Sequence, residues 1–454
     1  MKILETLKKY NLTFIMLNIY LFLVIVLPKE VNTIMGFIPI RTLLIFILFA
    51  GFLYDVFVKK MKLRKINLKW FSLFYLLFLF STIPSILVSK SIVTSIYTLI
   101  KFISYYMLIF IIIKTPFTKE EFKILFKNLF IATLLVTVYG LLQYIFEFDL
   151  NLNGTDKYKD IRGRIPSTFF NPIYFGVFIN IVFILFLTLF KKNIVKKPLV
   201  YVLLILLYTA LVLTFTRSAI LVFCGILFLT LLFNYKVIIN KLSIILLVII
   251  VMITLLIPGA KEVNLNSFQN GFDMLFNNNF LSSITLGGGK KNNNSTNKEP
   301  VIEDDSIEHR KQFALIAKKI AGNNPYTGVG FGSYLQYMDS EDFSKNYPEY
   351  TYSHTHPHSG FVLLAAETGY ISTTLFIICI GILGIYFIKE FINHFKEKKL
   401  TYELSLCSLS ISMGFLITCI VAENLFYDTQ IFPTYIVIVM LIYNFTKKEK
   451  SLDK

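Results

Sequence analysis

Histidine and arginine are the residues of this chain whose types and spacing best suit catalysis. Four of the five histidines fall in one polar segment, at His309, His354, His356 and His358. The spacing of the last three puts their imidazoles on one face of an extended segment, which could bind a metal ion or form a surface cluster without a role. The segment has no cysteine and its carboxylates are not at ligand spacing. We therefore favour one imidazole as a general base, since its unperturbed pKa of about 6.5 leaves it largely neutral at external pH.

Arginines occur in three short segments that could bind an anionic group. Arg217 lies in Thr214-Phe215-Thr216-Arg217-Ser218, Arg162 and Arg164 precede Ser167-Thr168-Phe169-Phe170-Asn171-Pro172, and Arg310 follows His309. A guanidinium is always charged and donates two parallel hydrogen bonds to phosphate oxygens, so grouped arginines suit a diphosphate. An adjacent imidazole could activate a hydroxyl. For Arg217 the alternative is an interfacial anchor whose charged end reaches water.

The polar segment that holds the histidines has two parts. Its first part is rich in Asn and Gly, including Gly287-Gly288-Gly289, and predicts a disordered insertion. Asp305 and Glu308 then resemble a capping box, and the apolar residues from Phe313 to Ile320 predict an amphipathic surface helix of about four turns. The glycine-rich stretch Gly328-Val329-Gly330-Phe331-Gly332 follows. Because it lacks the Lys and Ser/Thr of a P-loop and follows no predicted strand, a structural turn is favoured over a phosphate-binding loop.

The composition predicts an integral membrane protein. Hydrophobic residues make up 55% of the 454 residues and charged residues 16%, and the mean hydropathy is +0.65, outside the range of ordinary soluble domains. The net charge of +17 does not indicate a nucleic-acid binder, because the Lys and Arg residues lie in short segments between apolar runs.

Apolar runs recur along the chain and predict an all-α polytopic fold of about twelve transmembrane helices, since about 20 apolar residues cross a hydrocarbon core of roughly 30 Å. The predicted spans are 11–28, 33–57, 70–89, 92–113, 124–146, 171–190, 198–214, 218–233, 241–258, 360–388, 403–422 and 430–446.

Basic clusters fall in every second connection, which predicts that both termini are cytoplasmic. Helices 1–9 would then occupy residues 1–258, a large extracytoplasmic loop with the catalytic motifs 259–359, and helices 10–12 residues 360–454. The first run has no small-residue cleavage site, so we expect an uncleaved span. All four cysteines lie inside apolar runs, so we expect no disulfide framework in the outer loops.

In combination, these motifs resemble the O-antigen ligase and O-antigen polymerase superfamily of bacterial membrane glycosyltransferases. The resemblance runs from about residue 160 to 380. It rests on motifs that follow one another in the order of the family: Arg164 with Phe169-Phe170-Asn171-Pro172, Arg217, Arg310, Asn324-Pro325-Tyr326-Thr327-Gly328-Val329-Gly330-Phe331-Gly332, His356-Pro357-His358-Ser359 and Glu367-Thr368-Gly369. Ser359 stands where the family usually has Asn.

The resemblance implies a GT-C-like fold and a metal-independent, cofactor-free transfer of glycan from an undecaprenyl diphosphate carrier to an acceptor. Arg217, Arg310 and Arg164 would bind the diphosphate and offset the charge that develops on it. His358 would take the proton from the acceptor hydroxyl, with His356 as the second candidate for the base. Glu367 would orient an imidazole or act as an interfacial carboxylate.

Three functions remain open on the sequence. A polymerase extends a lipid-linked chain, a ligase moves the finished glycan to another acceptor, and a transporter only moves the lipid-linked sugar. A transporter predicts buried charges along a pathway and often repeated halves, and apart from Lys101 and Asp55 the charged candidates gather on one side. We expect a polymerase of a cell-surface polysaccharide in the cytoplasmic (inner or plasma) membrane, with its active site facing outward, because polymerases accompany many surface polysaccharides.

Overall fold

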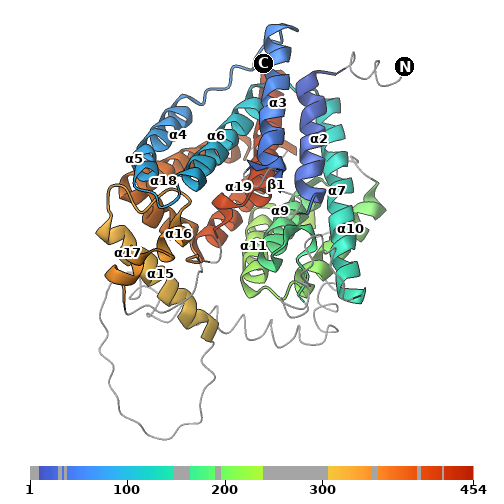
Figure 1. The fold of residues 1–454 in the computed structure, drawn as a ribbon. Helices are drawn as coiled ribbons and strands as arrows, with labels where there is room; N and C mark the ends of the chain where they lie inside the picture. Colours follow the sequence, from blue (N-terminus) through green and yellow to red (C-terminus); the bar gives the residue numbers. More distant parts are fainter. Residues whose placement is uncertain are drawn as a thin grey trace, which may run out of the picture.

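The computed structural model describes residues 10–28, 33–34, 38–146, 164–189, 196–238, 305–348, 356–395, 400–421 and 424–452. Within these residues all regular secondary structure is helical apart from one antiparallel pair of two-residue strands (Figure 1). The elements are α2 (Leu12–Val26), β1 (Thr33–Ile34), β2 (Ile38–Pro39), α3 (Ile40–Phe57), α4 (Lys69–Ser81), α5 (Ile83–Leu87), α6 (Ile92–Lys114), α7 (Lys119–Phe146), η2 (Ser167–Phe169), α9 (Pro172–Leu189), α10 (Lys197–Leu213), α11 (Arg217–Ile238), α15 (Asp305–Asn323), α16 (Tyr334–Met338), α17 (Glu341–Asn346), α18 (Gly360–His394), α19 (Leu400–Val421), η4 (Leu425–Tyr427) and α20 (Ile431–Leu452).

The polytopic helical architecture agrees with the apolar runs of the sequence. Seven helical segments are long and apolar enough to cross a bilayer, namely α3, α4 together with α5, α6, α7, α9, α18 and α19, and four shorter apolar helices accompany them, α2, α10, α11 and α20. These eleven correspond to eleven of the predicted spans. The twelfth, 241–258, lies outside the described residues, so the total of twelve stays a prediction.

One predicted span begins at the wrong residue. The run 33–57 was expected to be helical throughout, but Thr33–Ile34 pairs with Ile38–Pro39 as a short hairpin, and the helix begins only at Ile40. Pro39 explains this boundary. Proline has no backbone N–H and disfavours the helical conformation of the residue before it, so a helix starts at or after a proline more readily than it passes through one.

Helices α9 and α20 form the centre of the bundle, and almost all of their described side chains are buried. At one contact Gly176 of α9 faces Ala219 of α11, where an added Cβ would lie 2.7 Å from the Ala219 Cβ. The Asn180 side chain donates a hydrogen bond to the Ala219 carbonyl oxygen over 2.9 Å. Small residues let helices approach closely in a membrane protein, and this contact fixes the first turn of α11, which Arg217 begins.

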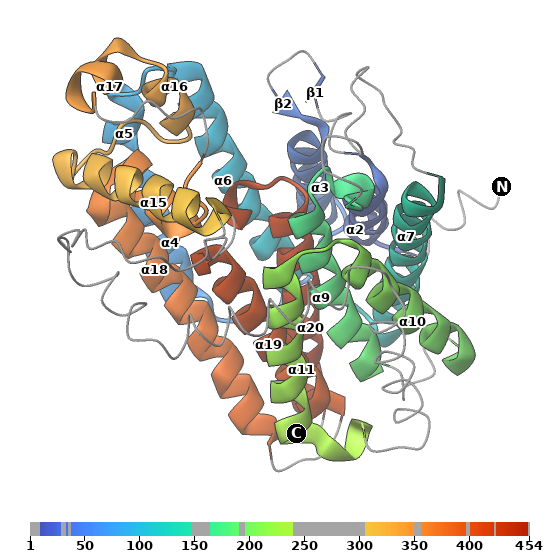
Figure 2. The same ribbon diagram turned by 90° about the horizontal axis from the view of Figure 1, so that it is seen from below.

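Helices α15, α16 and α17 lie together at one end of the bundle, which we call the loop end, and the end of α20 lies at the other (Figure 1). Helix α15 lies across α18 (Figure 2) and buries Ile316, Ala317 and Ile320, so the predicted amphipathic helix is confirmed. It has 19 residues, about five turns. Side chains of α16 and α17 complete a second small core with it.

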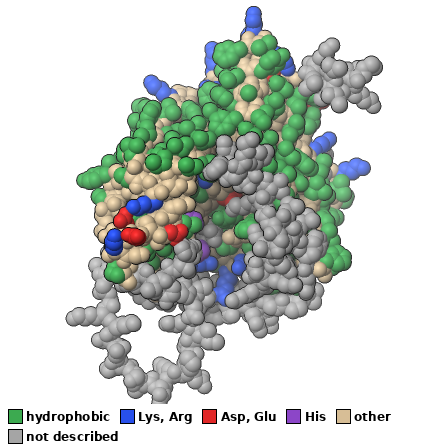
Figure 3. Space-filling view, viewed as in Figure 1, with side chains coloured by type: hydrophobic (Ala, Val, Ile, Leu, Met, Phe, Trp, Pro, Cys, Tyr) green, Lys and Arg blue, Asp and Glu red, His purple; other side chains and the backbone are tan. Residues whose placement is uncertain are grey.

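The surface has the pattern expected of a protein surrounded by lipid. Large apolar side chains are exposed along the spans, such as Phe80, Ile377 and Ile392, which are 66%, 49% and 62% exposed. Figure 3 shows apolar side chains over a broad region of one face, between Lys and Arg side chains at one end and mixed charges at the loop end. A soluble monomer rarely exposes contiguous apolar surface of this extent.

Candidate active site

Arg164 and the turn between α10 and α11 lie in direct contact. The Arg164 Nε donates to the Thr214 carbonyl oxygen over 2.9 Å, and its Nη2 donates to Thr216 Oγ1 over 2.8 Å. The backbone N–H of Ile165 donates to the Leu213 carbonyl oxygen. Arg217, the first residue of α11, is exposed immediately after this turn. We call Arg164 and residues 214–217 the arginine turn.

The arginine turn holds a backbone conformation that non-glycine residues seldom adopt. Phe215 has a φ of 46°, in the left-handed region, where such a residue costs roughly 1–3 kcal/mol and persists only if its surroundings enforce it. The two Arg164 hydrogen bonds and the buried Thr214 and Thr216 side chains supply that enforcement. The third predicted arginine, Arg310, is half-buried on α15, a different element.

The glycine-rich stretch is a turn packed tightly between helices. Gly328, Gly330 and Gly332 have φ values of 61°, 125° and 76°. A Cβ on Gly328 would lie 2.2 Å from the Glu367 carbonyl carbon, and one on Gly332 would lie 2.1 Å from Thr98 Oγ1. Each of the three positions therefore requires glycine both for backbone freedom and for space. We call residues 328–333 the glycine turn.

The backbone N–H groups of the glycine turn are directed at protein acceptors. Val329 and Gly330 donate to the carbonyl oxygens of Ala366 and Glu367 at 3.0 Å each, and Gly328 donates to Asn324. Helix α18 has a break at Gly369 (φ 76°, ψ 176°), where the Tyr370 N–H donates to the Pro325 carbonyl oxygen over 2.7 Å. These contacts favour the structural turn over the phosphate-binding loop, because the N–H groups named here already have acceptors.

Glu367 is buried, 1% exposed, and connects α18 with the glycine turn and η4. Its Oε2 accepts from the Gly332 N–H at 2.8 Å and from the Tyr427 hydroxyl at 2.5 Å, and its Oε1 accepts from the Tyr334 N–H at 3.3 Å. The two carboxyl oxygens together have enough lone pairs to accept all three donors. These bonds connect Glu367 to the backbone on both sides of Ser333 and to the Tyr427 hydroxyl. The structure thus gives Glu367 a part in holding the turn that the sequence did not indicate.

The histidine segment lies beside the glycine turn. His356 and His358 are half-buried just before α18, and the His356 ring stacks on Tyr334, with centroids 6.0 Å apart and planes 28° apart. Figure 3 shows histidine side chains in a recess of the surface near the loop helices, with Lys and Arg side chains close by. His354 lies outside the described residues, and so does the side chain of His309. Among the described residues no group of three His, Cys, Asp or Glu side chains could hold a metal ion.

Hydrogen bonds through the segment around η4 link η2 with helix α18. Thr168, four residues after Arg164, donates to the Ile25 carbonyl oxygen over 2.9 Å, and the Gln430 Nε2 donates to the same oxygen over 3.0 Å. Gln430 follows η4, whose last residue Tyr427 donates to Glu367. The segment around η4 therefore connects Thr168 with Glu367, the carboxylate that holds the glycine turn.

Two buried cations near η4 and the end of α2 have local partners. The Lys101 Nζ donates to the Tyr427 carbonyl oxygen over 3.1 Å and lies 5.5 Å and 5.3 Å from the ring centroids of Tyr97 and Tyr427. Such cation–π contacts stabilise a desolvated ammonium. Arg41, which we did not single out in the sequence, is fully buried and donates to the carbonyl oxygen of Leu27 at the end of α2. An arginine two residues after Pro39 and inside an apolar run was the available signal.

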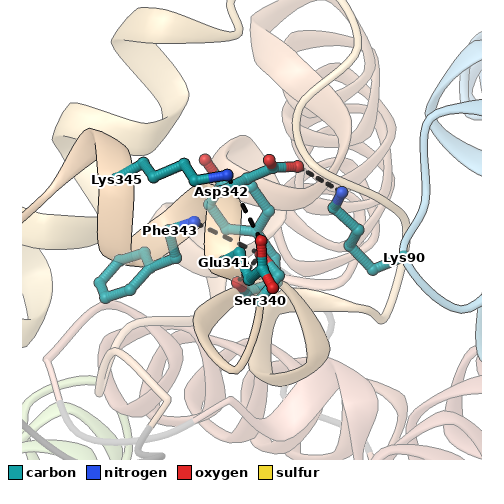
Figure 4. Close-up of polar contacts among 7 residues, drawn as sticks. Lys90, Ser340, Glu341, Asp342, Phe343 and Lys345 are labelled. Carbon is teal, nitrogen blue, oxygen red and sulfur yellow. Dashed lines mark hydrogen bonds and ion pairs between the residues drawn. The ribbon is translucent and has the colours of Figure 1, made fainter.

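The loop helices are also attached to the corner between α5 and α6. The Ser333 hydroxyl bonds with Ser89 at 2.7 Å and with Ser95 at 3.1 Å. Lys90 of the same corner pairs with Asp342 of α17 (Figure 4). Both partners of this ion pair are exposed to solvent, so the pair adds little stability. It mainly sets the position of α17.

Comparison with known proteins finds a match for part of the chain. Residues 201–377 match the family model described as O-antigen ligase, a range that includes the arginine turn from its Thr214 onward, α15, the glycine turn, the histidine segment and Glu367. No curated protein matches the chain. The match confirms the resemblance to the O-antigen ligase and polymerase superfamily.

Proposed function

We propose that this chain, whose residues 201–377 match the O-antigen ligase family model, is a membrane glycosyltransferase that polymerises a cell-surface polysaccharide. Its donor is an undecaprenyl diphosphate-linked oligosaccharide, and its acceptor is a sugar hydroxyl at the outer face of the cytoplasmic membrane. The observation that carries the proposal is the contact of Arg164 with the turn that leads into Arg217. It joins two arginine motifs that are far apart in the sequence.

Arginines are the groups best suited to the leaving diphosphate. Arg217 is exposed at the start of α11, and Arg164 is tied to the same turn. A fixed guanidinium can donate to two phosphate oxygens at once and stabilise the charge that develops there. We assign diphosphate binding to Arg217 and Arg164, with Arg310 of α15 as a third contributor.

His358 is the proposed general base. The acceptor hydroxyl oxygen forms a bond to the anomeric carbon while the bond from that carbon to the diphosphate oxygen breaks, and its electron pair stays with the diphosphate. The proton of the hydroxyl passes to the His358 imidazole. In-line attack inverts the configuration at the anomeric carbon. His356 is the second candidate, and no metal ion takes part in this proposal.

Ligation is the second candidate function, and the description of the matching family favours it. A ligase would use the same donor groups and transfer the finished glycan once to a different lipid, protein or wall acceptor. The products differ, since a polymerase yields a ladder of glycans that differ by one repeat unit and a ligase yields a single conjugate. We prefer polymerisation because the lipid-linked oligosaccharide then serves as both donor and acceptor, whereas a ligase needs a different acceptor.

The deciding experiment measures transfer by purified protein in lipid nanodiscs from undecaprenyl diphosphate-linked oligosaccharide. We expect His358→Ala to abolish transfer while donor binding stays nearly intact, because arginines bind the donor and the imidazole acts in the chemical step. A chelator should have no effect. Chelator-sensitive transfer with equal losses in His354→Ala, His356→Ala and His358→Ala would instead establish a metal site, and an active His358→Ala enzyme would remove that residue from catalysis.

A further inference from the structure

Helix α18 and the segment before it form a closed circuit of contacts around His358. The chain runs from His356 through Pro357 and His358 into α18, where Glu367 accepts hydrogen bonds from the N–H groups of Gly332 and Tyr334. Tyr334 then stacks on His356. The circuit thus returns to its starting point through one aromatic contact, and His358 lies between the two ends that are held.

Both ends of this circuit are firmly placed. At the α18 end, Gly360 packs on Phe426, where an added Cβ would lie 3.0 Å from the ring. At the other end Tyr334 is completely buried and begins α16, so its ring can move little. The Pro357 between the ends has a fixed φ. Removal of the aromatic contact would free the histidine segment at one end only.

We propose that Tyr334 is a positioning residue that fixes the His358 imidazole by stacking on His356. This inference rests on the proposed function, because it assigns Tyr334 a part in the same transfer reaction. Aromatic pairs of this kind contribute about 0.5–1.5 kcal/mol beyond burial. A displacement of a catalytic group by about 1 Å can cost on the order of 100-fold in rate, so a modest contact has a large kinetic effect at this position.

The structure offers a matched control on the same short helix. Tyr337 is also a buried tyrosine of α16, 8% exposed, but its ring packs on Phe343 of α17. Tyr334→Leu and Tyr337→Leu therefore remove similar side chains from the same small core, and only the first removes the stack on His356. Tyr334→Phe keeps the ring and should therefore keep the function.

The kinetic test compares these variants with wild type in the transfer assay. Tyr334→Leu should lower kcat by about 10- to 100-fold with little change in KM for the donor, Tyr334→Phe should stay within about threefold of wild type, and Tyr337→Leu should lose stability without this loss of kcat. Equal kcat losses in Tyr334→Leu and Tyr337→Leu would show a merely structural role and overturn the inference.

A second measurement does not depend on transfer at all. Hydrogen exchange of the backbone amides of residues 358–363 should quicken in Tyr334→Leu and in His356→Ala, which leaves the packing of Tyr334 in its own core intact, and should stay at the wild-type rate in Tyr337→Leu. Unchanged exchange in both of the first two variants would overturn the inference while the proposed function stood. If the wild-type protein shows no transfer, the proposed function is excluded. The exchange measurement then still tests whether Tyr334 anchors the histidine segment.

Discussion

At the scale of single residues, the candidate site depends on side chains that other residue types replace poorly or not at all. Arg164 uses both its Nε and its Nη2 on one turn, a geometry that the single ammonium of lysine cannot reproduce. Glu367 accepts three hydrogen bonds with two oxygens. Both residues thus act through the number and direction of their hydrogen-bonding atoms.

Arg217→Lys tests whether the arginine turn binds a diphosphate. Lysine keeps the charge and loses the bidentate fork, so we expect kcat/KM for the lipid-linked donor to fall by about tenfold or more with normal membrane insertion. Arg64→Lys is the control, because Arg64 bonds to the Asn444 carbonyl oxygen far from the loop end and should be catalytically silent. Full activity of both Arg217→Ala and Arg310→Ala would exclude these arginines from the site.

At the scale of secondary-structure elements, the glycine turn and the break in α18 fit each other. Gly328 lets the turn touch the backbone of Glu367, and Gly369 opens the helix where Pro325 and Tyr326 approach. Gly328 and Gly369 are therefore explained by one interface between a turn and a helix, while Gly330 and Gly332 face Ser89 and Thr98. This interface holds Glu367 and Tyr334 next to the histidine segment.

Gly332→Ala should disrupt the packing of the glycine turn against α6. The new Cβ would clash with Thr98 and occupy a φ of 76°, so we expect destabilisation of at least about 2 kcal/mol and loss of transfer. Gly322→Ala is the matched control, because Gly322 lies in α15 with open space around the added Cβ and alanine favours a helix by about 1 kcal/mol. Thermal unfolding of the two purified variants gives the comparison, and equal melting temperatures would contradict the packing described here.

The ion pair between Lys90 and Asp342 predicts a pH dependence of the docking of α17. The hydrogen bond from Lys90 lowers the pKa of the Asp342 carboxyl below its usual value. A depressed folded-state pKa contributes stability above the unfolded pKa, and this stability is lost as pH falls through the folded pKa. The protection factors of the α17 amides, which correct for the pH dependence of intrinsic exchange, should therefore fall at acidic pH in wild type. Asp342→Asn should exchange faster at neutral pH and lack this component, and because both side chains are exposed the effect should be small.

At the scale of the whole molecule, the loop helices lie at one end of the bundle and the end of α20 at the other (Figure 1). The segment between α3 and α4 contains Lys60, Lys62 and Lys65, a basic cluster that the positive-inside rule assigns to the cytoplasm. The candidate site would then face outward. This arrangement is needed for a reaction on a lipid-linked glycan at the outer face.

Cysteine labelling in intact cells tests this orientation. In a cysteine-free background, an impermeant thiol reagent should modify a cysteine at Asn293 and should not modify one at Lys65, which is exposed on the surface and would react if it were outside. After the cells are permeabilised, Lys65→Cys should become reactive, which controls for access. Modification of Lys65→Cys in intact cells would reverse the predicted topology and move the candidate site to the cytoplasmic side.

The sequence by itself determined the membrane-spanning helices, the amphipathic helix α15 and the family resemblance. These features are local. A span is a run of apolar residues, an amphipathic helix has apolar residues with a period of 3.6, and a motif is a short series of residue types in a given order. The predicted start of the span 33–57 was wrong because hydropathy alone does not distinguish a short apolar hairpin from the helix that follows it.

Only the tertiary structure decided which of these segments meet. No spacing in the sequence indicates that Arg164 bonds to the turn before Arg217, that Glu367 accepts from Gly332, Tyr334 and Tyr427, or that Tyr334 stacks on His356. Partners this far apart are brought together by the packing of several helices at once. Hydrogen bonds and ring contacts extend only a few ångströms, so their partners are fixed by the fold and not by the local pattern.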